Sequence, residues 1–340
     1  MAAVVSPLVF ALAVPGVFPA ADAGTRVSRP VLPQGKLLRT GKPPSPRGAK
    51  LWVNPGNPAA KALVTDRSLL PGEAMLVSKI ARSPQSNWLT SWLTASTVAP
   101  YVAGKTKAAS SAAAVPVFVL YNIPFRDCGL YSAGGASTNA AYRAWIRGVA
   151  KGLSGERAIV VLEPDSLAGI DCLPEAGQAD RYALLNDAVN VLTANPRLSV
   201  YLDAGNARWK PADVMAPRLA KAGLGRVRGF SVNAGNFDTT ANEIAYAKSI
   251  NRALGAAVPF VVDTSRNGNG PWAGADVRWC NPPGRALGAR PTTQHPDPLV
   301  DALLWIKTPG LSDGSCGRGL PAAGVWWRSY AVQLARNAHW

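Results

Sequence analysis

The chain has 340 residues, of which 48% are hydrophobic and 16% are charged, and this balance predicts a globular protein with a sizeable core. The formal net charge of +16 is compatible with nucleic acid or an anionic surface as a partner. The basic residues are scattered through the chain, so we interpret them as a solvated surface and expect no nucleic-acid partner.

Residues 1–23 are predicted to be a secretory signal peptide. An apolar run leads to the small-residue A-x-A pattern of Ala21–Ala23, so we expect cleavage before Gly24. The positive start typical of such signals is missing, because no Lys or Arg precedes the run. Three prolines interrupt a run already short for a bilayer, so no stable membrane insertion is expected. The chain is therefore predicted to be secreted and extracellular.

Residues 24–50 form a Pro-rich and basic segment that is typical of a linker, and a single domain is predicted over residues 51–340. In a secreted chain, the four cysteines are expected to form disulfides, and three pairings are possible. A metal site is not expected, since the sequence has no C-x-x-C and only two histidines. No cofactor is expected either.

From residue 51 onward, short aliphatic runs alternate with longer segments of helical spacing. The clearest helical pattern is residues 178–195, where Tyr182, Leu185, Val189 and Leu192 recur at three- and four-residue steps. Other helices are expected at 138–153, 211–223, 240–255 and 326–338. Strands are expected at 51–54, 115–122, 158–164, 198–205, 227–235, 258–265 and 303–310.

Repeated strand-helix units predict an α/β fold with parallel strands covered by helices. Seven such runs favour a single distorted (β/α) barrel of TIM type, with an open active-site cleft at the carboxyl ends of the strands. A doubly wound open sheet is the alternative, and it would place a site at the same strand ends.

Polar side chains follow six of the predicted strands, and together they are difficult to explain as helix caps or turns alone. Aspartates that converge without a nearby histidine, in a chain with 11 tryptophans, suit glycoside hydrolysis. One carboxyl group gives a proton to the leaving oxygen, another assists water or attacks the sugar, and crowding raises one pKa. Tryptophans offer flat apolar faces to sugar rings. The residues are Asn122, Asp127, Glu163, Asp165, Asp203, Asn233, Asn236, Asp263, Arg266, Lys307 and Asp313.

The motif LEPDSLA (162–168) resembles the general-acid motif of glycoside hydrolase family 6, the inverting cellulases. Six further blocks agree in order, so the resemblance covers residue 50 to the end of the chain. They are YNIPFRDC (121–128), YLDAGNARW (201–209), GFSVNAGNF (229–237), VVDTSRNGNGPW (261–272), RWCNPPGRALG (278–288) and DALLWIKTPGLSDG (301–314).

The resemblance implies that Asp165 is the general acid and that Asp127 raises its pKa and helps to hold the catalytic water. Tyr121 would press against the distorted sugar. Asp313 matches the residue usually proposed as the base, acting directly or through waters. Residues that would orient this cluster, pair with the base or hold the water are Asp203, Arg126, Arg266 and Ser132.

The resemblance also implies sugar stacking on Trp209 and Trp279 and hydroxyl binding by Lys307. We assign Asn206, Asn233 and Asn236 to substrate binding as well. Glu163 is interpreted as a structural hydrogen-bond partner. Five other tryptophans are expected to pack in the core or against helices: Trp52, Trp88, Trp92, Trp145 and Trp305. The implied disulfides pair Cys128 with Cys172 and Cys280 with Cys316.

Two positions depart from the family pattern. Asn206 stands where the family usually has His, and Leu311 stands where it commonly has Glu, two residues before the presumed base. These departures motivate one alternative, a catalytically weakened carbohydrate-binding protein on the same scaffold. A serine hydrolase is disfavoured, because the G-x-S-x-G match at 310–314 lacks the following helix.

The short segment after Asp313 favours an open cleft and internal cutting. The resemblance therefore implies a secreted endoglucanase, expected to be a monomer, that acts on cellulose or a related β-1,4-glucan. An exo-acting cellobiohydrolase is the other alternative.

Overall fold

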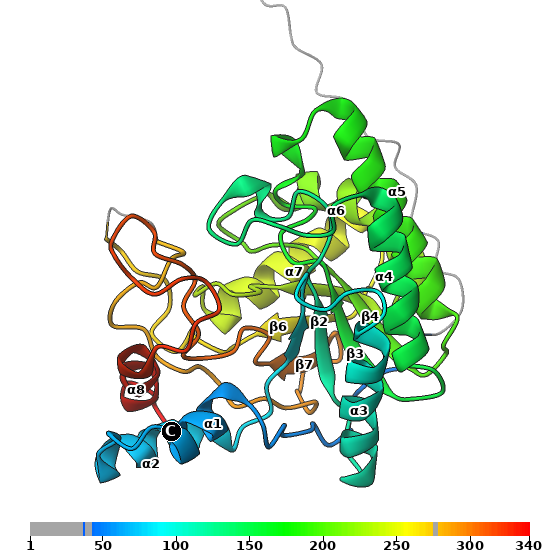
Figure 1. Ribbon diagram of the computed structural model, residues 1–340. Coiled ribbons are helices and arrows are strands. Elements are labelled where there is room, and N and C mark those ends of the chain that lie inside the picture. Colours follow the sequence, from blue (N-terminus) through cyan, green and yellow to red (C-terminus); the bar gives the residue numbers. More distant parts are fainter. Residues whose placement is uncertain (1–36, 38–42, 275–277) are drawn as a thin grey trace, which may run out of the picture. The chain divides into compact units, whose positions relative to one another are not determined.

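The computed structural model describes residue 37, residues 43–274 and residues 278–340 (Figure 1). The predicted signal peptide lies outside the described residues. The described end of the Pro-rich segment packs against the domain: Ser45 Oγ donates to Asp301 Oδ1 over 3.2 Å, and Arg47 donates to the Val300 carbonyl over 2.6 Å.

The fold is built on one sheet of seven parallel strands in sequential order. Among the described residues, no β-ladder joins the first strand to the last. Two hydrogen bonds connect the segments at these two edges: Ser86 N donates to the Trp305 carbonyl over 3.1 Å, and Trp88 Nε1 donates to the Ile306 carbonyl over 2.8 Å. This confirms the distorted barrel, and the sequential order excludes the doubly wound alternative. The strands are β1 (Asn87–Leu89), β2 (Val117–Leu120), β3 (Ala158–Leu162), β4 (Leu198–Asp203), β5 (Gly229–Val232), β6 (Phe260–Asp263) and β7 (Val300–Leu304).

Alternate strand residues serve two cores, as the period of two requires. Phe118 and Leu120 of β2 pack outward against the helices, whereas Val117 and Val119 fill the inside of the curled sheet with Tyr201. Figure 1 shows helices α3 to α7 around the outside of the sheet. They are α3 (Val98–Ser111), α4 (Asn139–Gly152), α5 (Glu175–Thr193), α6 (Ala212–Lys221) and α7 (Thr240–Leu254).

Helix boundaries follow local sequence signals. Thr138 caps α4, since its side chain accepts from Ala141 N, and α7 ends at Gly255, which adopts a left-handed conformation with φ of 59°. On α5, the predicted Leu185, Val189 and Leu192 are buried. These helices match the predicted segments within a few residues.

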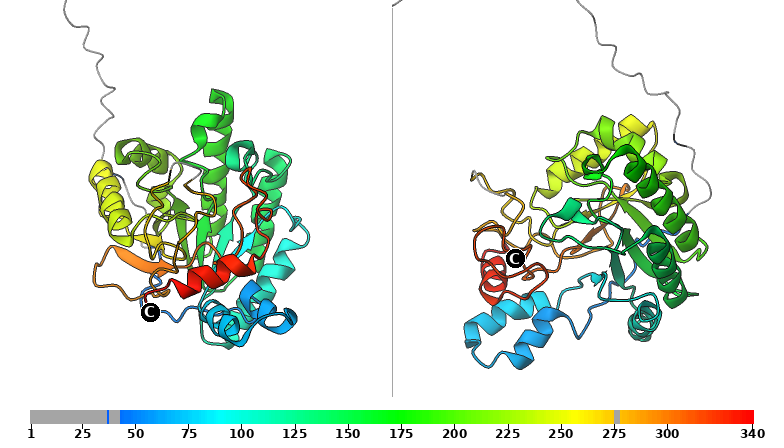
Figure 2. Two further views of the ribbon diagram at one scale, coloured as in Figure 1. Left: turned by 90° about the vertical axis from the view of Figure 1, so that its left-hand side faces the viewer. Right: turned by 45° about the horizontal axis from the view of Figure 1, so that its top comes forward.

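A third cluster joins the two ends of the described chain. Helices α1 (Pro58–Thr65) and α2 (Pro71–Ala81) pack with α8 (Arg328–Arg336) around Trp305. Both views of Figure 2 show the red α8 beside the blue α1 and α2.

The structure corrects two of the predicted strands. The strand expected at 303–310 is β7, which ends at Leu304, so residues 305–310 form no strand. Residues 51–54 form no strand, because only Leu51 makes an isolated parallel bridge, to Val115. Residues 87–89 form β1 instead, and α1, α2 and α3 were not predicted. Trp92 was expected to pack in the core or against a helix; it is 60% exposed, outside the core, and packs edge-on against Tyr101 of α3.

Candidate active site

Asp165 lies just beyond β3 with its backbone held in an unusual conformation. Its φ is 68°, a left-handed value that non-glycine residues seldom adopt. Asp165 N donates to Asp203 Oδ1 over 3.0 Å, and Tyr121 Oη donates to Asp165 Oδ2 over 3.4 Å. Burial, followed by the charges of Asp203 and Asp127, raises the pKa of Asp165 well above its ordinary value. This carboxyl group is therefore suited to carrying a proton.

Asp203 ends β4 and holds the backbone around the acid. It is 1% exposed, and besides Asp165 N it accepts from Gly205 N over 2.9 Å and Ser231 Oγ over 3.0 Å. Burial raises its pKa to about 6, although these donors oppose the effect. Asp203 thus orients Asp165 and the loop that follows β4.

Asp127 and Arg126 lie in the loop after β2. Arg126 stacks over the Tyr121 ring, 4.6 Å from its centroid, and donates to the carbonyls of Tyr121 and Ser132 over 2.7 Å each. Asp127 Oδ2 accepts from Ser132 N over 2.6 Å. Burial raises the pKa of Asp127 despite this hydrogen bond. Arg126 therefore fixes a loop that presents a second carboxyl group with proton affinity.

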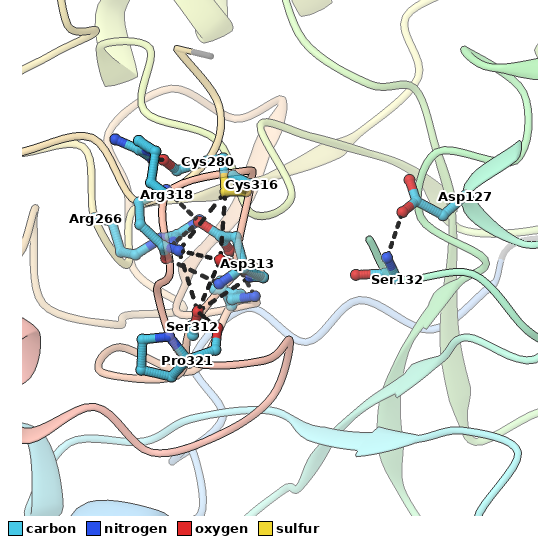
Figure 3. The surroundings of a disulfide bond; sticks show 12 residues. Asp127, Ser132, Arg266, Cys280, Ser312, Asp313, Cys316, Arg318 and Pro321 are labelled. Atoms are coloured by element: carbon cyan, nitrogen blue, oxygen red, sulfur yellow. Dashed lines mark hydrogen bonds and ion pairs between the residues drawn. A yellow bond between two sulfur atoms is a disulfide. The ribbon is translucent and has the colours of Figure 1, made fainter. Parts of the chain in front are cut away.

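Asp313 has the opposite electrostatic character. Arg266 Nη1 lies 2.7 Å from Asp313 Oδ2, and Lys307 Nζ lies 2.8 Å from Asp313 Oδ1. Burial alone would raise the pKa of Asp313, but the two cations bring it below its ordinary value. Figure 3 shows Arg266 beside Asp313 on one side and Asp127 with Ser132 on the other.

Lys307 connects the two sides of the site. Its ammonium pairs with Asp313 and also lowers the pKa values of Asp127 and Asp165 against the effect of burial. Acids from the ends of β2 and β3 and from the segment after β7 therefore act on a shared region. This juxtaposition is the one that the sequence predicts.

Two further residues support this geometry: Asp263, which was predicted at a strand end but given no role, and Asn281, which was not predicted. Asp263, at the end of β6, accepts from the backbone N–H groups of Gly235 over 2.8 Å and Lys307 over 2.9 Å. Asn281 and Asp313 form two reciprocal hydrogen bonds. Asn281 N donates to Asp313 Oδ2 over 3.0 Å, and Asp313 N donates to Asn281 Oδ1 over 2.8 Å. The only sequence signals were the polar end of β6 and the position of Asn281 directly after Cys280.

The two tryptophans predicted to bind sugar are half exposed, at 40% for Trp209 and 39% for Trp279. Trp209 packs on two glycines: a Cβ added to Gly169 or Gly205 would lie 3.5 or 3.4 Å from its ring. Trp279 contacts Tyr131 at a centroid distance of 5.9 Å. Both tryptophans retain an exposed apolar surface, unlike Trp145 and Trp305, which are 2% and 1% exposed and belong to the core as predicted.

The three asparagines assigned to substrate differ. Asn233 is fully buried; its amide donates to the carbonyls of Asp238 and Asp263, and its oxygen accepts from Asp238 N. These contacts occupy both the amide nitrogen and the amide oxygen of a buried side chain, so the expectation of direct sugar binding by Asn233 is wrong. Asn236 is partly exposed, and Asn206 is 7% exposed with its oxygen accepting from Arg208 N.

The pairings that the family resemblance implies are present: Cys128 with Cys172, and Cys280 with Cys316. Each tethers a loop beside a carboxyl group of the site. Glu163 is 0% exposed and accepts from the backbone N–H groups of Asn122 and Ile123, which confirms a structural role.

Within residues 43–274 and 278–340, no group of three or more acidic, histidine or cysteine side chains is arranged to hold a metal ion. None of the helices described there has the length and apolar character needed to cross a bilayer.

The model of the family described as Glycosyl hydrolases family 6 matches residues 46–338. Endoglucanase A of Cellulomonas fimi is 43% identical over 298 residues, 87% of this chain and 61% of that protein. Endoglucanase 1 of Streptomyces sp. strain KSM-9 is 40% identical over 301 residues, 87% of this chain and 77% of that protein. This chain thus spans less than two thirds of the Cellulomonas fimi relative.

Among solved structures, the endoglucanase Cel6 from Mycobacterium tuberculosis superposes with a TM-score of 0.82 at 46% identity. The match covers 85% of this chain and 97% of that chain. Its complex contains methyl-cellobiosyl-4-deoxy-4-thio-β-D-cellobioside.

Proposed function

This chain belongs to glycosyl hydrolase family 6, and on that premise we propose that it cuts internal β-1,4-glucosidic bonds of cellulose or a related β-glucan with inversion. The observation that carries the proposal is the contrast between two carboxyl groups: burial and neighbouring acids raise the pKa of Asp165, whereas the paired Arg266 and Lys307 lower the pKa of Asp313. Two carboxyl groups whose surroundings shift their pKa values in opposite directions are typical of a catalytic acid and its partner base.

Asp165 is proposed to protonate the glycosidic oxygen of the leaving sugar. Its raised pKa, from burial and then from Asp203 and Asp127, supports this role, because a general acid must carry its proton at working pH. As the bond breaks, charge develops on the sugar ring, and the Tyr121 hydroxyl beside Asp165 lies where it can orient that ring. Asp127 is proposed to help hold the attacking water, because it retains proton affinity close to the acid.

Asp313 is proposed to act as a fixed negative charge that orients the attacking water. A strong general base has a pKa near the working pH, whereas the pKa of Asp313 lies below its ordinary value. Its two oxygens are occupied by Arg266 and Lys307. Proton removal through an intervening water fits this carboxylate better than direct abstraction.

The substrate is proposed to be a β-1,4-linked glucan that stacks on Trp209 and Trp279. Their exposed ring faces suit the apolar faces of pyranose rings, and the structural relative from Mycobacterium tuberculosis is described with a cellobioside ligand. Secretion is proposed from the two disulfides, which persist in oxidising compartments.

One observation favours exo-acting cleavage as a second candidate. Tyr131, in the loop after β2, contacts Trp279, in the loop after β6, so two loops from opposite sides of the site meet. A loop contact of this kind would restrict entry of an internal chain segment. The 1,4-beta-D-glucan cellobiohydrolase C of Emericella nidulans is 31% identical over 353 residues, 86% of this chain and 78% of that protein.

The test is the product profile on a cello-oligosaccharide labelled at its reducing end, with proton NMR of the fresh products. Internal cleavage, with new reducing ends appearing as the α anomer, supports the proposal. Release of cellobiose alone from one end supports the exo-acting candidate. A first-formed β anomer would contradict inversion. Oligosaccharide binding without any release of reducing ends would favour the weakened binding protein suggested by Asn206 and Leu311.

A further inference from the structure

The loop at residues 204–209 follows β4 and rests on helix α7. Ala207 N donates to Glu243 Oε1 over 3.0 Å, and Tyr246 Oη donates to the Ala204 carbonyl over 3.4 Å. Glu243 and Tyr246 are three residues apart, so they lie on the same face of the helix. One face of α7 therefore binds both a backbone N–H and a backbone carbonyl of this loop.

Glu243 is a buried acid that the proposed reaction does not use. It is 0% exposed, and Oε2 has no hydrogen-bond partner in the part of the chain that the structure describes. A buried carboxylate with an unsatisfied oxygen is costly, so the neutral acid is favoured. Burial raises the pKa of Glu243 to about 8, opposed by the Ala207 N–H.

The 204–209 loop, which Glu243 contacts, supports two parts of the site: the carboxylate of Asp203 and the ring of Trp209. Gly205 N donates to Asp203 Oδ1, which also accepts from Asp165 N. The Trp209 ring lies against Gly205, where an added Cβ would come within 3.4 Å of it. A shift of the loop would therefore move the predicted sugar platform and loosen a contact of the residue that orients the acid.

We propose that Glu243 is a positioning residue that fixes the 204–209 loop, and with it the Trp209 platform, only while its side chain is neutral. The inference deepens the proposed function and rests on it. Glu243 acts through the loop backbone and has no direct part in the chemistry.

The charges around Glu243 determine the sign of the pH effect. Asp238, after β5, and Asp203, of β4, raise its pKa, and Arg208, in the loop itself, lowers it. Arg208 is also paired with Asp238 over 3.1 Å, so little positive charge is left to balance an ionised Glu243. Near pH 8 Glu243 loses its proton, and the buried charge destabilises the docked loop. Affinity for sugar is therefore expected to fall as the pH rises through about 8.

The test compares Glu243→Gln, Glu243→Ala and the control Glu156→Gln, which changes a partly exposed glutamate in the turn before β3. Binding of cellotetraose is measured by calorimetry in an Asp165→Asn background, between about pH 6 and about pH 9.5. Values of KM and kcat are measured in the otherwise native chain. Binding needs no turnover, so the two proposals are tested separately.

We expect the parent and Glu156→Gln proteins to lose affinity above about pH 8, by about fivefold if one loop hydrogen bond is lost. Glu243→Gln keeps a neutral acceptor for Ala207 N, so its affinity should not weaken with pH. Glu243→Ala should raise KM at all pH values, with a smaller effect on kcat.

An alkaline loss of affinity in Glu243→Gln equal to that of the parent would overturn the inference. So would unchanged affinity in a folded Glu243→Ala protein. If circular dichroism shows that Glu243→Ala does not fold, the glutamine variant alone decides. Absence of cellotetraose binding and turnover in every protein would instead refute the proposed function.

Discussion

Replacement of Lys307 by methionine removes the cation that connects the two sides of the site. Lys307 Nζ lies 2.8 Å from Asp313 Oδ1, and the two side chains are 16% and 8% exposed. At an effective dielectric constant of about 20, unit charges at this separation attract by about 6 kcal/mol. Desolvation of the ammonium and the remaining pair with Arg266 offset most of this energy. We expect the pKa of Asp313 to rise in the variant, because one of the two cations that lower it is lost.

The same change raises the pKa values of Asp165 and Asp127, because the Lys307 charge lowers both in the native protein. The proposed mechanism requires Asp165 protonated and Asp313 ionised, so both limbs of the pH profile should move to higher pH. The assay is kcat/KM against pH on a soluble β-glucan. Lys307→Arg, which retains the charge, is the control and should keep the native optimum. An optimum in Lys307→Met that stays in place or moves to lower pH would refute this electrostatic account.

Two further changes test the platform and the tethers. Trp209→Ala should raise KM about tenfold through lost stacking and should affect kcat less. The control is Trp92→Ala, at a tryptophan that is 60% exposed, and it should leave KM unchanged. Equal effects of the two changes on KM would exclude Trp209 from substrate binding. Replacing Cys128 and Cys172 together by serine should lower the free energy of unfolding in urea by about 2–4 kcal/mol, because the bridge closes a loop across a sequence separation of 44. An unchanged urea midpoint and slope would show that this tether does not stabilise the domain.

The sequence predicts the fold where periodicity is strong. Strands β2 to β7 are aliphatic runs, a helix lies between each neighbouring pair from β2 to β6, and α4 to α7 carry clear caps or apolar stripes. Strand β1 has three residues, Asn87–Leu89, too few to show a period of two. Helix α3 is rich in alanine and serine, so it has no strong apolar stripe. Helices α1 and α2 bury their apolar residues in the cluster that also contains Trp305 and α8.

The sequence predicts which carboxyl groups gather at one edge of the sheet, because parallel strands bring their carboxyl ends to that edge. Site prediction fails where the use of a side chain depends on contacts from distant segments. Asn233 follows β5 as a sugar ligand would, yet its amide is occupied by the backbone of Asp238 and Asp263. Glu243 has only helical spacing in the sequence, and its contact with Ala207 appears only when α7 packs on the β4 loop.

The most direct measurement is turnover and binding by Asp165→Asn, which removes the proposed proton donor and keeps its size. Turnover of a cello-oligosaccharide with a poor leaving group should fall by about a thousandfold or more, with dissociation constants for the same sugar within about threefold of the native value. A variant that cleaves at the native rate would contradict the assignment of Asp165 as the acid, and with it the central claim that crowding keeps this carboxyl group protonated for catalysis.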